Sequence, residues 1–168
     1  AGRPPGLAPL RALAQVIVAA VLLTTMTALA GAADPVDIPI VFLKEHVARP
    51  PALSNLLPPP ADSGLAGAQL GVSDSNTTGR FLGQRYRLLS DSADSAGTLL
   101  DIARRRVGDG NPFIVAEEAA ATLLLIADDP AIRGKAIVFN SGAADDQLRN
   151  RECRTGLLHT LPSHAMLG

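Results

Sequence analysis

The segment from Pro112 to Asn140, PFIVAEEAAATLLLIADDPAIRGKAIVFN, carries the pattern that decides the fold. Short apolar runs at 112–115 and 136–140 contain Val, Ile and Phe in succession, which predicts two strands. The Ala- and Leu-rich stretch 117–126 between them predicts a helix that ends before the turn residues 128–130. A strand, a crossing helix and a second strand make a βαβ unit, whose two strands run parallel.

The same alternation continues on both sides of this unit. Further strands are predicted at 36–43, 84–89 and 156–160, and Pro39 indicates that the first of them starts late or lies at an edge there. Further helices are predicted from Asp62 or Ser63 through Val72, from Ser92 or Asp94 to Val107, and from 162–164 onward. The order predicts an α/β fold, a three-layer lobe with a mostly parallel sheet and helices on both faces.

Composition excludes several classes of partner. The net charge is −1, tryptophan is absent and aromatic residues make up 3%, so neither a basic surface nor a stacking platform for bases is indicated. Cys153 is the only cysteine, which leaves no internal disulfide. We expect no nucleic-acid partner.

The N-terminal segment has the three parts of a secretory signal peptide. Arg3 and Arg11 precede an apolar run at 12–30, and small residues follow up to Ala33. We expect residues 1–33 to be a cleaved signal peptide and the mature protein to be periplasmic. A membrane anchor is the alternative, because about 19 apolar residues nearly span a bilayer.

The two ends suggest that the sequence is a piece of a longer protein. It begins with Ala1 rather than Met and finishes inside an apolar phrase at 165–167. We expect residues 34–168 to form one small, incomplete N-terminal lobe.

Small polar residues follow the last two predicted strands, and these loops are the candidate ligand site. Ligands of parallel sheets bind at the carboxyl ends of strands. The predicted ligand-binding residues are Asn140, Ser141, Gly142, Ala143, His159, Thr160 and Ser163. Four of them also have a structural interpretation, since Ser141-Gly142 suits a turn, His159 a packed histidine and Ser163 a helix cap.

Patterns for catalysis, cofactors and metals are weak. Cys153, His159 and His164 match no common zinc spacing. The glycines at 64, 67 and 71 follow no strand in the order that a dinucleotide site needs, and no nucleophile elbow is present. Arg104-Arg105-Arg106 is predicted to be a solvated helix face. We therefore expect no catalytic residue, no metal ligand and no cofactor.

Four phrases resemble a known family. The phrase at 64–72, GLAGAQLGV, is similar to the helix after the first strand of leucine/isoleucine/valine-type periplasmic binding proteins. More narrowly, three phrases together resemble one subfamily. They are NTTGRFLGQ at 76–84, RECR at 151–154 and LHTLPS at 158–163. The members of this subfamily are the solute-binding components of ABC transporters associated with PQQ-dependent alcohol dehydrogenase systems. The resemblance spans about Val36 to Leu167.

The resemblance implies a type I periplasmic binding protein fold, of which this chain is the first half. The family has a second lobe and two more hinge crossovers, which this chain lacks. It also implies that the loop at about 141–143 holds the carboxylate of a ligand.

The expected function is non-catalytic capture of a small solute by the periplasmic substrate-binding component of an ABC importer, with the resemblance implying a link to quinoprotein alcohol oxidation. The expected partners are the solute and the permease and ATPase subunits, with membrane contact only through the permease. Two alternatives stay open. One is an exported α/β enzyme, for which His159 and Ser141 are the available groups, and the other is a ligand-sensing receptor lobe.

Overall fold

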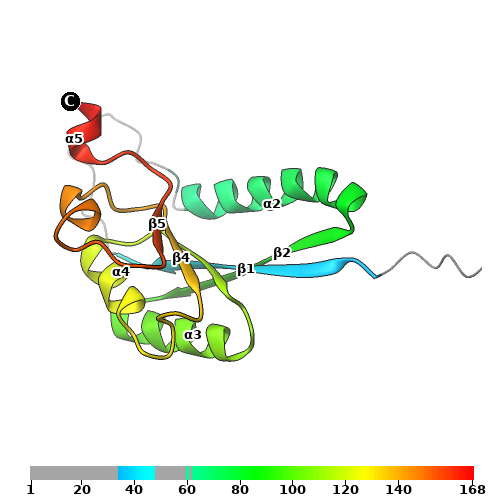
Figure 1. Ribbon diagram of the computed structural model, residues 1–168, viewed down its shortest axis with the longest axis horizontal. Coiled ribbons are helices and arrows are strands. Elements are labelled where there is room, and N and C mark those ends of the chain that lie inside the picture. The colour runs from blue at the N-terminus through cyan, green and yellow to red at the C-terminus, as the bar shows by residue number, and fades with distance from the viewer. Residues whose placement is uncertain (1–33, 48–59, 61) are drawn as a thin grey trace, which may run out of the picture. The chain divides into compact units, whose positions relative to one another are not determined.

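The computed structural model describes residues 34–47, 60 and 62–168, and the chain divides between Asp34 and Pro35. The predicted signal peptide lies outside these residues, and the described residues of Pro35–Gly168 form one compact unit (Figure 1). The strands are β1 Val36–Glu45, β2 Gln84–Ala93, β3 Phe113–Ala116, β4 Ile137–Asn140 and β5 Leu157–His159. The helices are α2 Ser63–Leu82, α3 Ala96–Gly108, α4 Ala120–Ala127 and α5 His164–Leu167, with a 3-10 turn η1 at Asp146–Arg149.

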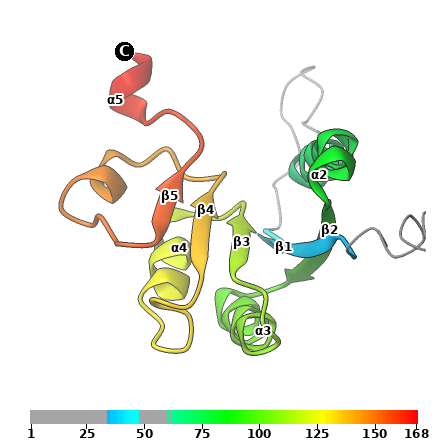
Figure 2. The ribbon, with the colours of Figure 1, turned by 45° about the vertical axis from the view of Figure 1, so that its right-hand side comes forward.

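The five strands form one parallel sheet in the order β2-β1-β3-β4-β5. The chain crosses from β1 to β2 through α2 on one face, and then from β2 to β3 through α3 on the other face (Figure 2). The strand order therefore reverses between β1 and β3, and the carboxyl ends of these two strands form the topological switch point. The predicted α/β class and parallel sheet are confirmed.

The core lies between the sheet and the two helices α3 and α4, which cover one of its faces. Fully buried Val41, Leu43 and Ile114 point from β1 and β3 toward Leu99 of α3 and Leu123 of α4. Because side chains alternate along a strand, the neighbouring residues of these strands face α2 instead. Apolar area removed from water stabilises a fold by roughly 25 cal/mol per Å², so this continuous core is the main source of stability.

Pro39 lies inside β1, and the pairing explains why a proline fits there. β1 pairs with β2 from Val36 to Glu45, but β3 pairs only with Ile40–Leu43. The backbone N–H of Val36 points toward the β2 side, where it bonds the carbonyl of Gly83, so alternation turns the nitrogen of Pro39 to the opposite side. Among the described residues, no strand pairs with β1 on that side beside Pro39, and the prediction that Pro39 occupies an edge is confirmed.

Helix α2 is ten residues longer than predicted, and its second half is fastened to β2. The side-chain amide of Asn76 accepts from the backbone N–H of Tyr86 at 2.8 Å and donates to its carbonyl at 2.9 Å. At Gly79 a Cβ atom would lie 2.7 Å from the carbonyl oxygen of Gln84, so the helix and strand approach closely only because this residue is glycine. The phrase at 76–84 therefore joins a helix to a strand.

The remaining boundaries differ from the predictions by a few residues. Helix α3 is capped by Ser95, whose side chain accepts from the N–H of Thr98 at 3.2 Å. Helix α4 begins at Ala120, so Glu117 and Glu118 belong to the preceding loop and not to the helix.

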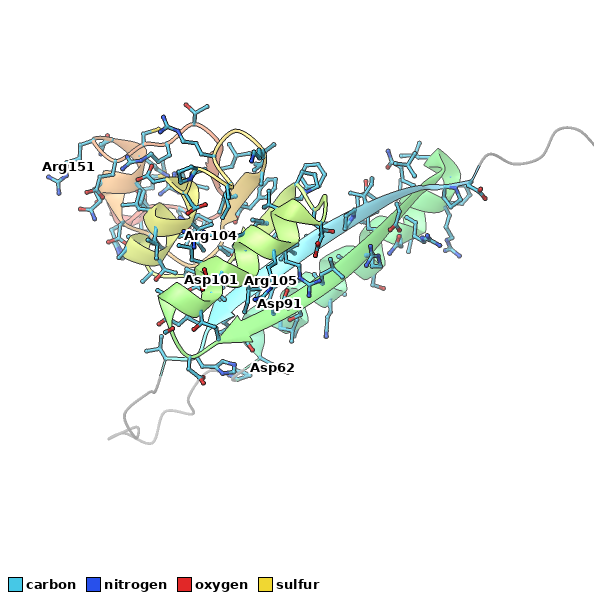
Figure 3. All side chains as sticks on the ribbon, turned by 90° about the horizontal axis from the view of Figure 1, so that it is seen from below. Asp62, Asp91, Asp101, Arg104, Arg105 and Arg151 are labelled. Carbon is cyan, nitrogen blue, oxygen red and sulfur yellow. The ribbon has the colours of Figure 1, made fainter. Side chains whose placement is uncertain are left out.

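The arginines of α3 are not simply a solvated face. Arg104 pairs with Asp101, both labelled in Figure 3, and with the buried Asp129. Arg106 pairs with Asp91 of β2. These pairs tie α3 to the end of α4 and to the sheet. The side chains of Arg104 and Arg106 remain 44% and 30% exposed, so the predicted solvated face also carries ion pairs.

Candidate functional site

The carboxyl edge of the sheet, where the parallel strands end, collects all the predicted ligand-binding residues. Asn140 and His159 are the last residues of the paired strands β4 and β5 and lie opposite each other in the register. Ser141 to Ala143 continue from β4, and Thr160 and Ser163 follow β5. The predicted residues therefore lie together at one edge of the sheet, where several of them make hydrogen bonds within the protein.

Asn140 is fully buried and fixes the loop that follows it. Its side-chain oxygen accepts from the N–H groups of Gly142 at 3.0 Å and Ala143 at 2.8 Å. Its amide nitrogen donates to the carbonyl of Ala143 at 2.7 Å and lies 3.0 Å from Nδ1 of His159. One side chain thus closes the loop after β4 and joins it to β5.

The hydroxyl groups on this edge also have partners within the protein. Ser141 donates through both its backbone N–H, at 3.0 Å, and its Oγ, at 3.2 Å, to the carbonyl of Ala116 at the end of β3. Thr160 also donates twice to one carbonyl, that of Asn140, through its backbone N–H at 3.1 Å and its Oγ1 at 2.9 Å. These donors and the backbone N–H groups of residues 142 and 143 are therefore all engaged within the protein.

The start of α5 already has an anionic partner. The carboxylate of Asp146 accepts from the backbone N–H of Ala165 at 2.9 Å. Hydrogen bonds from the Ser163 hydroxyl and from Ala165 hold the pKa of Asp146 below its usual value. Ser163 itself is buried and makes no capping hydrogen bond through its side chain. The first turn of α5 is therefore bonded to a carboxylate of the protein itself, that of Asp146.

His159 is half-buried between the loop after β4 and η1. Burial, and then the nearby charge of Arg149, lower its pKa, so the ring is neutral at pH 7. Asn140 Nδ2 donates to Nδ1, which places the ring proton on Nε2. The residue behaves as a packed histidine that aligns two strand ends.

Four charged residues that the sequence analysis did not assign to the site lie at the switch point. Lys44 and Glu45 end β1, and Glu117 and Glu118 follow β3. The Nζ of Lys44 lies 2.9 and 3.0 Å from the two carboxylate oxygens of Glu117. Their sequence signal is their position at or directly after the carboxyl ends of two neighbouring parallel strands, which could be recognised only once the strand order was known.

Glu118 is the most strongly perturbed of these groups. It is 5% exposed, and its Oε1 accepts from the backbone N–H of Glu45 at 2.7 Å. Burial raises its pKa to about 7, with the carboxylates of Glu45 and Glu117 acting in the same direction. At neutral pH this side chain is divided between its neutral and charged forms.

The loops after β3 and β4 are in direct contact. A Cβ atom at Gly142 would lie 2.5 Å from the backbone nitrogen of Glu118 and 2.8 Å from its carbonyl oxygen. A side chain at Gly64, in the first turn of α2, would likewise overlap the carboxylate of Glu117. Glycines therefore let α2, the loop after β3 and the loop after β4 converge on the switch point.

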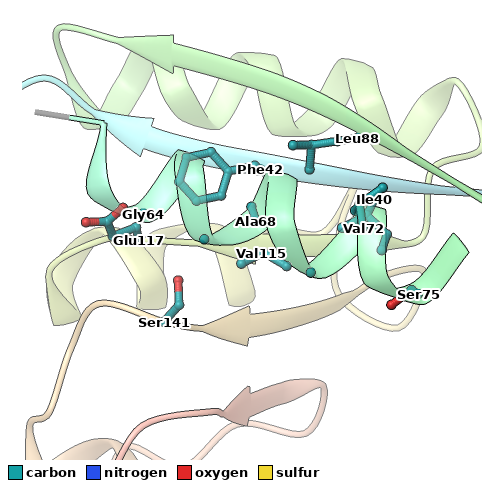
Figure 4. A pocket seen from close by; sticks show the side chains of 12 residues that line it. Ile40, Phe42, Gly64, Ala68, Val72, Ser75, Leu88, Val115, Glu117 and Ser141 are labelled. Atoms are coloured by element: carbon teal, nitrogen blue, oxygen red, sulfur yellow. The ribbon is translucent and has the colours of Figure 1, made fainter. Parts of the chain in front are cut away.

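A cavity of about 600 Å³ extends from the switch point between α2 and the sheet (Figure 4). Its walls are mostly apolar, and Glu117 and Ser141 are the polar side chains at the end nearest the carboxyl edge. A second apolar hollow, of about 430 Å³, is lined by residues that include Phe113 and Phe139. The cavity thus combines an apolar body with a polar end.

Within the part of the chain that the structure describes, no group of His, Cys, Asp and Glu is arranged to hold a metal ion. Ser141 and His159 share no hydrogen bond there, since each is bonded to a different neighbour. Among the same residues, no helix combines the length and apolarity needed to cross a membrane.

Comparison with known proteins gives a structural likeness. No protein family and no curated protein matches the sequence. The structure is similar to a crystal structure of the leucine-, isoleucine-, valine-, threonine- and alanine-binding protein from Brucella ovis in its closed conformation, with a TM-score of 0.54 and 21% identity. The alignment covers 78% of this chain and 33% of that protein, so the chain spans a third of its neighbour's length. The described unit has the architecture of part of a type I periplasmic binding protein.

Proposed function

We propose that this chain belongs to the substrate-binding component of an ABC importer and captures a small solute without chemistry. The observation that carries the proposal is the position of the loops after β3, β4 and β5, which meet at one edge of a parallel lobe. In two-lobed binders that edge faces the second lobe, which closes on the ligand. The fold likeness to an amino-acid-binding protein supports the same function.

The predicted leader and the four family-like phrases extend this proposal. Residues 1–33 would direct the protein to the periplasm, and the permease and ATPase subunits would be its partners. The resemblance to solute-binding proteins of PQQ-dependent alcohol dehydrogenase systems suggests a solute connected with that oxidation. Recovery of the intact N-terminus in washed membranes would contradict export by a cleaved leader.

A solute screen on the full-length protein tests the function. Thermal-shift measurement against amino acids, amines, carboxylic acids and alcohols, followed by calorimetric titration, should identify a solute that raises Tm. Thr160→Val should weaken its binding, because the hydroxyl holds the end of β4 against the loop after β5. Asp128→Ala should leave affinity unchanged, since Asp128 ends α4 at the opposite edge and pairs with Arg154. A folded protein that binds no solute would overturn the proposal.

A further inference from the structure

The two edge strands of the sheet differ in length. β5 has three residues and β2 has ten, and the two strands lie at opposite ends of the sheet (Figure 2). The outer side of an edge strand carries unpaired N–H and C=O groups, and native proteins shorten such strands, place proline or lysine in them, or cover them. β2 is long and contains neither proline nor lysine. It is therefore protected only where another element covers it.

Alternation along β2 identifies the backbone groups that face away from the sheet. The N–H of His46, just after β1, bonds the carbonyl of Ala93, so odd-numbered residues of β2 point toward β1. Even-numbered residues therefore point outward. Tyr86 agrees with this direction, because its N–H and its C=O both bond the side chain of Asn76 on α2.

Helix α2 covers this edge at one place. It crosses the sheet obliquely, since Gly64 in its first turn lies beside Glu117 after β3, whereas Asn76 reaches the outer side of β2. Three outward-facing positions of β2 lie beyond this cover, and their backbone groups form no hydrogen bond with a described residue. They are Leu88, Ser90 and Ser92.

A second copy of the same strand fits these three positions. Antiparallel pairing about a two-fold axis at Ser90 sets each Ser90 opposite its counterpart, and Leu88 opposite Ser92 of the second copy. Residues that face outward in this register exchange both of their backbone hydrogen bonds. Tyr86, which Asn76 already holds, falls outside the paired stretch.

The first half of β2 carries a surplus positive charge. Arg85 and Arg87 share one carboxylate, that of Asp37, and their side chains are 65% and 52% exposed. One of the two arginine charges therefore has no counter-charge among these three residues.

The second half of β2 carries an acidic residue. Asp91 pairs with Arg106, and its side chain remains 20% exposed. Each of its oxygens accepts one hydrogen bond from Arg106, and a carboxylate oxygen has room for a second. Antiparallel pairing centred on Ser90 brings Arg87 diagonally beside Asp91 of the second copy, at a spacing that a long side chain spans. The charges of β2 therefore complement those of an antiparallel copy of itself.

We propose that β2 pairs with β2 of a second copy of this chain along residues 88–92, forming a two-fold symmetric dimer with one continuous sheet. The inference is independent of the proposed solute capture. Only a short stretch of each strand takes part, so the dimer is weak and depends on protein concentration.

Analytical ultracentrifugation of the full-length protein should show a monomer–dimer equilibrium. Ser90→Pro should abolish the dimer, because it removes an N–H at the centre of the paired stretch that no described residue uses. Pro39 in β1 shows that this sheet accepts a proline whose nitrogen faces no strand. Ser90→Ala keeps the backbone donor and is the matched control, which should dimerise like the wild type. Circular dichroism shows that each variant is folded.

The charge complementarity has its own test. Arg87→Glu should weaken the dimer by about tenfold, because the two-fold axis repeats the lost pair. Arg85→Glu is the matched change, since it alters the same charge and the same partner, Asp37, but lies further from the paired stretch. It should weaken the dimer less than Arg87→Glu does.

Cross-linking locates the interface directly, on a protein in which Cys153→Ser removes the native thiol. Ser90→Cys should give a disulfide-linked dimer on mild oxidation, because opposite Cα atoms of a hydrogen-bonded antiparallel pair lie about 5.5 Å apart, within disulfide range. Ser73→Cys, at an exposed position of α2, is the control and should remain uncross-linked.

Two results would overturn the inference. One is a protein that stays monomeric at its highest soluble concentration and forms no cross-link through Ser90→Cys. The other is a dimer that persists in folded Ser90→Pro, which would place the interface elsewhere. If Ser90→Pro fails to fold, the cross-linking comparison between positions 90 and 73 decides the question.

Discussion

The carboxylate of Glu118 accepts a hydrogen bond from the backbone N–H of Glu45 across 2.7 Å. The two residues follow β3 and end β1, the neighbouring strands at which the sheet order reverses. A titratable group therefore supports the geometry of the switch point. Its protonation links the stability of this edge to pH.

Glu118→Gln should change how stability depends on pH. Because burial raises the pKa of Glu118 from 4.5 to about 7, the folded protein holds a proton that the unfolded chain releases. This stabilisation is complete below about pH 4.5 and is lost as the pH rises to about 7, by about 3 kcal/mol at most. Urea unfolding at pH 5 and pH 8 should show this loss in the wild type and not in the variant. Parallel pH profiles would contradict the assignment.

His159→Gln should act in the opposite direction. The folded pKa of His159 lies below its ordinary value of 6.5, so neutral histidine favours the folded protein above that pH. The contribution is lost as the pH falls below 6.5, because the unfolded chain then binds the proton more readily. The wild type should lose stability on acidification relative to the variant. NMR titration of the ring resonances would measure the pKa directly, and a value above 6.5 would be inconsistent with this prediction.

Asn140→Ala should destabilise the protein by about 2–4 kcal/mol, because it leaves buried N–H groups of the loop after β4 without acceptors. Ser141→Ala is the comparison and should cost about 1 kcal/mol, since the backbone N–H of residue 141 keeps its bond to Ala116. Equilibrium unfolding of both variants gives the two free energies. Equal losses would mean that the Asn140 amide does not hold the loop.

Gly142→Ala should destabilise by about 1–3 kcal/mol, because the added methyl group meets the backbone of Glu118. Gly67→Ala on α2 is the matched change, since nothing lies within 4 Å of its Cβ position. That variant should be stabilised by about 0.5–1 kcal/mol through helix propensity. Thermal unfolding should move Tm in opposite directions, and a shift of the same sign in both would show that the loops after β3 and β4 are not in close contact.

The amino-acid sequence by itself determined the order of strands and helices. Apolar runs such as 112–115 and 136–140 predict strands, and the helix between them predicts parallel pairing, because the signals are local and repeated. Position after a strand also predicted that Ser141 and Thr160 lie at the carboxyl edge of the sheet. Element ends were less well predicted, as in α2, whose last turns depend on the fastening of Asn76 to Tyr86.

Only the tertiary structure decided which polar groups at that edge remain available. Glu118 lies in contact with Glu45, 73 residues away in sequence, because β1 and β3 are neighbours in the sheet. The two donors of Ser141 are engaged for the same reason, since their acceptor Ala116 ends a different strand. Long-range pairing brings these groups together, and a local pattern of residue types carries no record of which carbonyl or carboxylate each donor will meet.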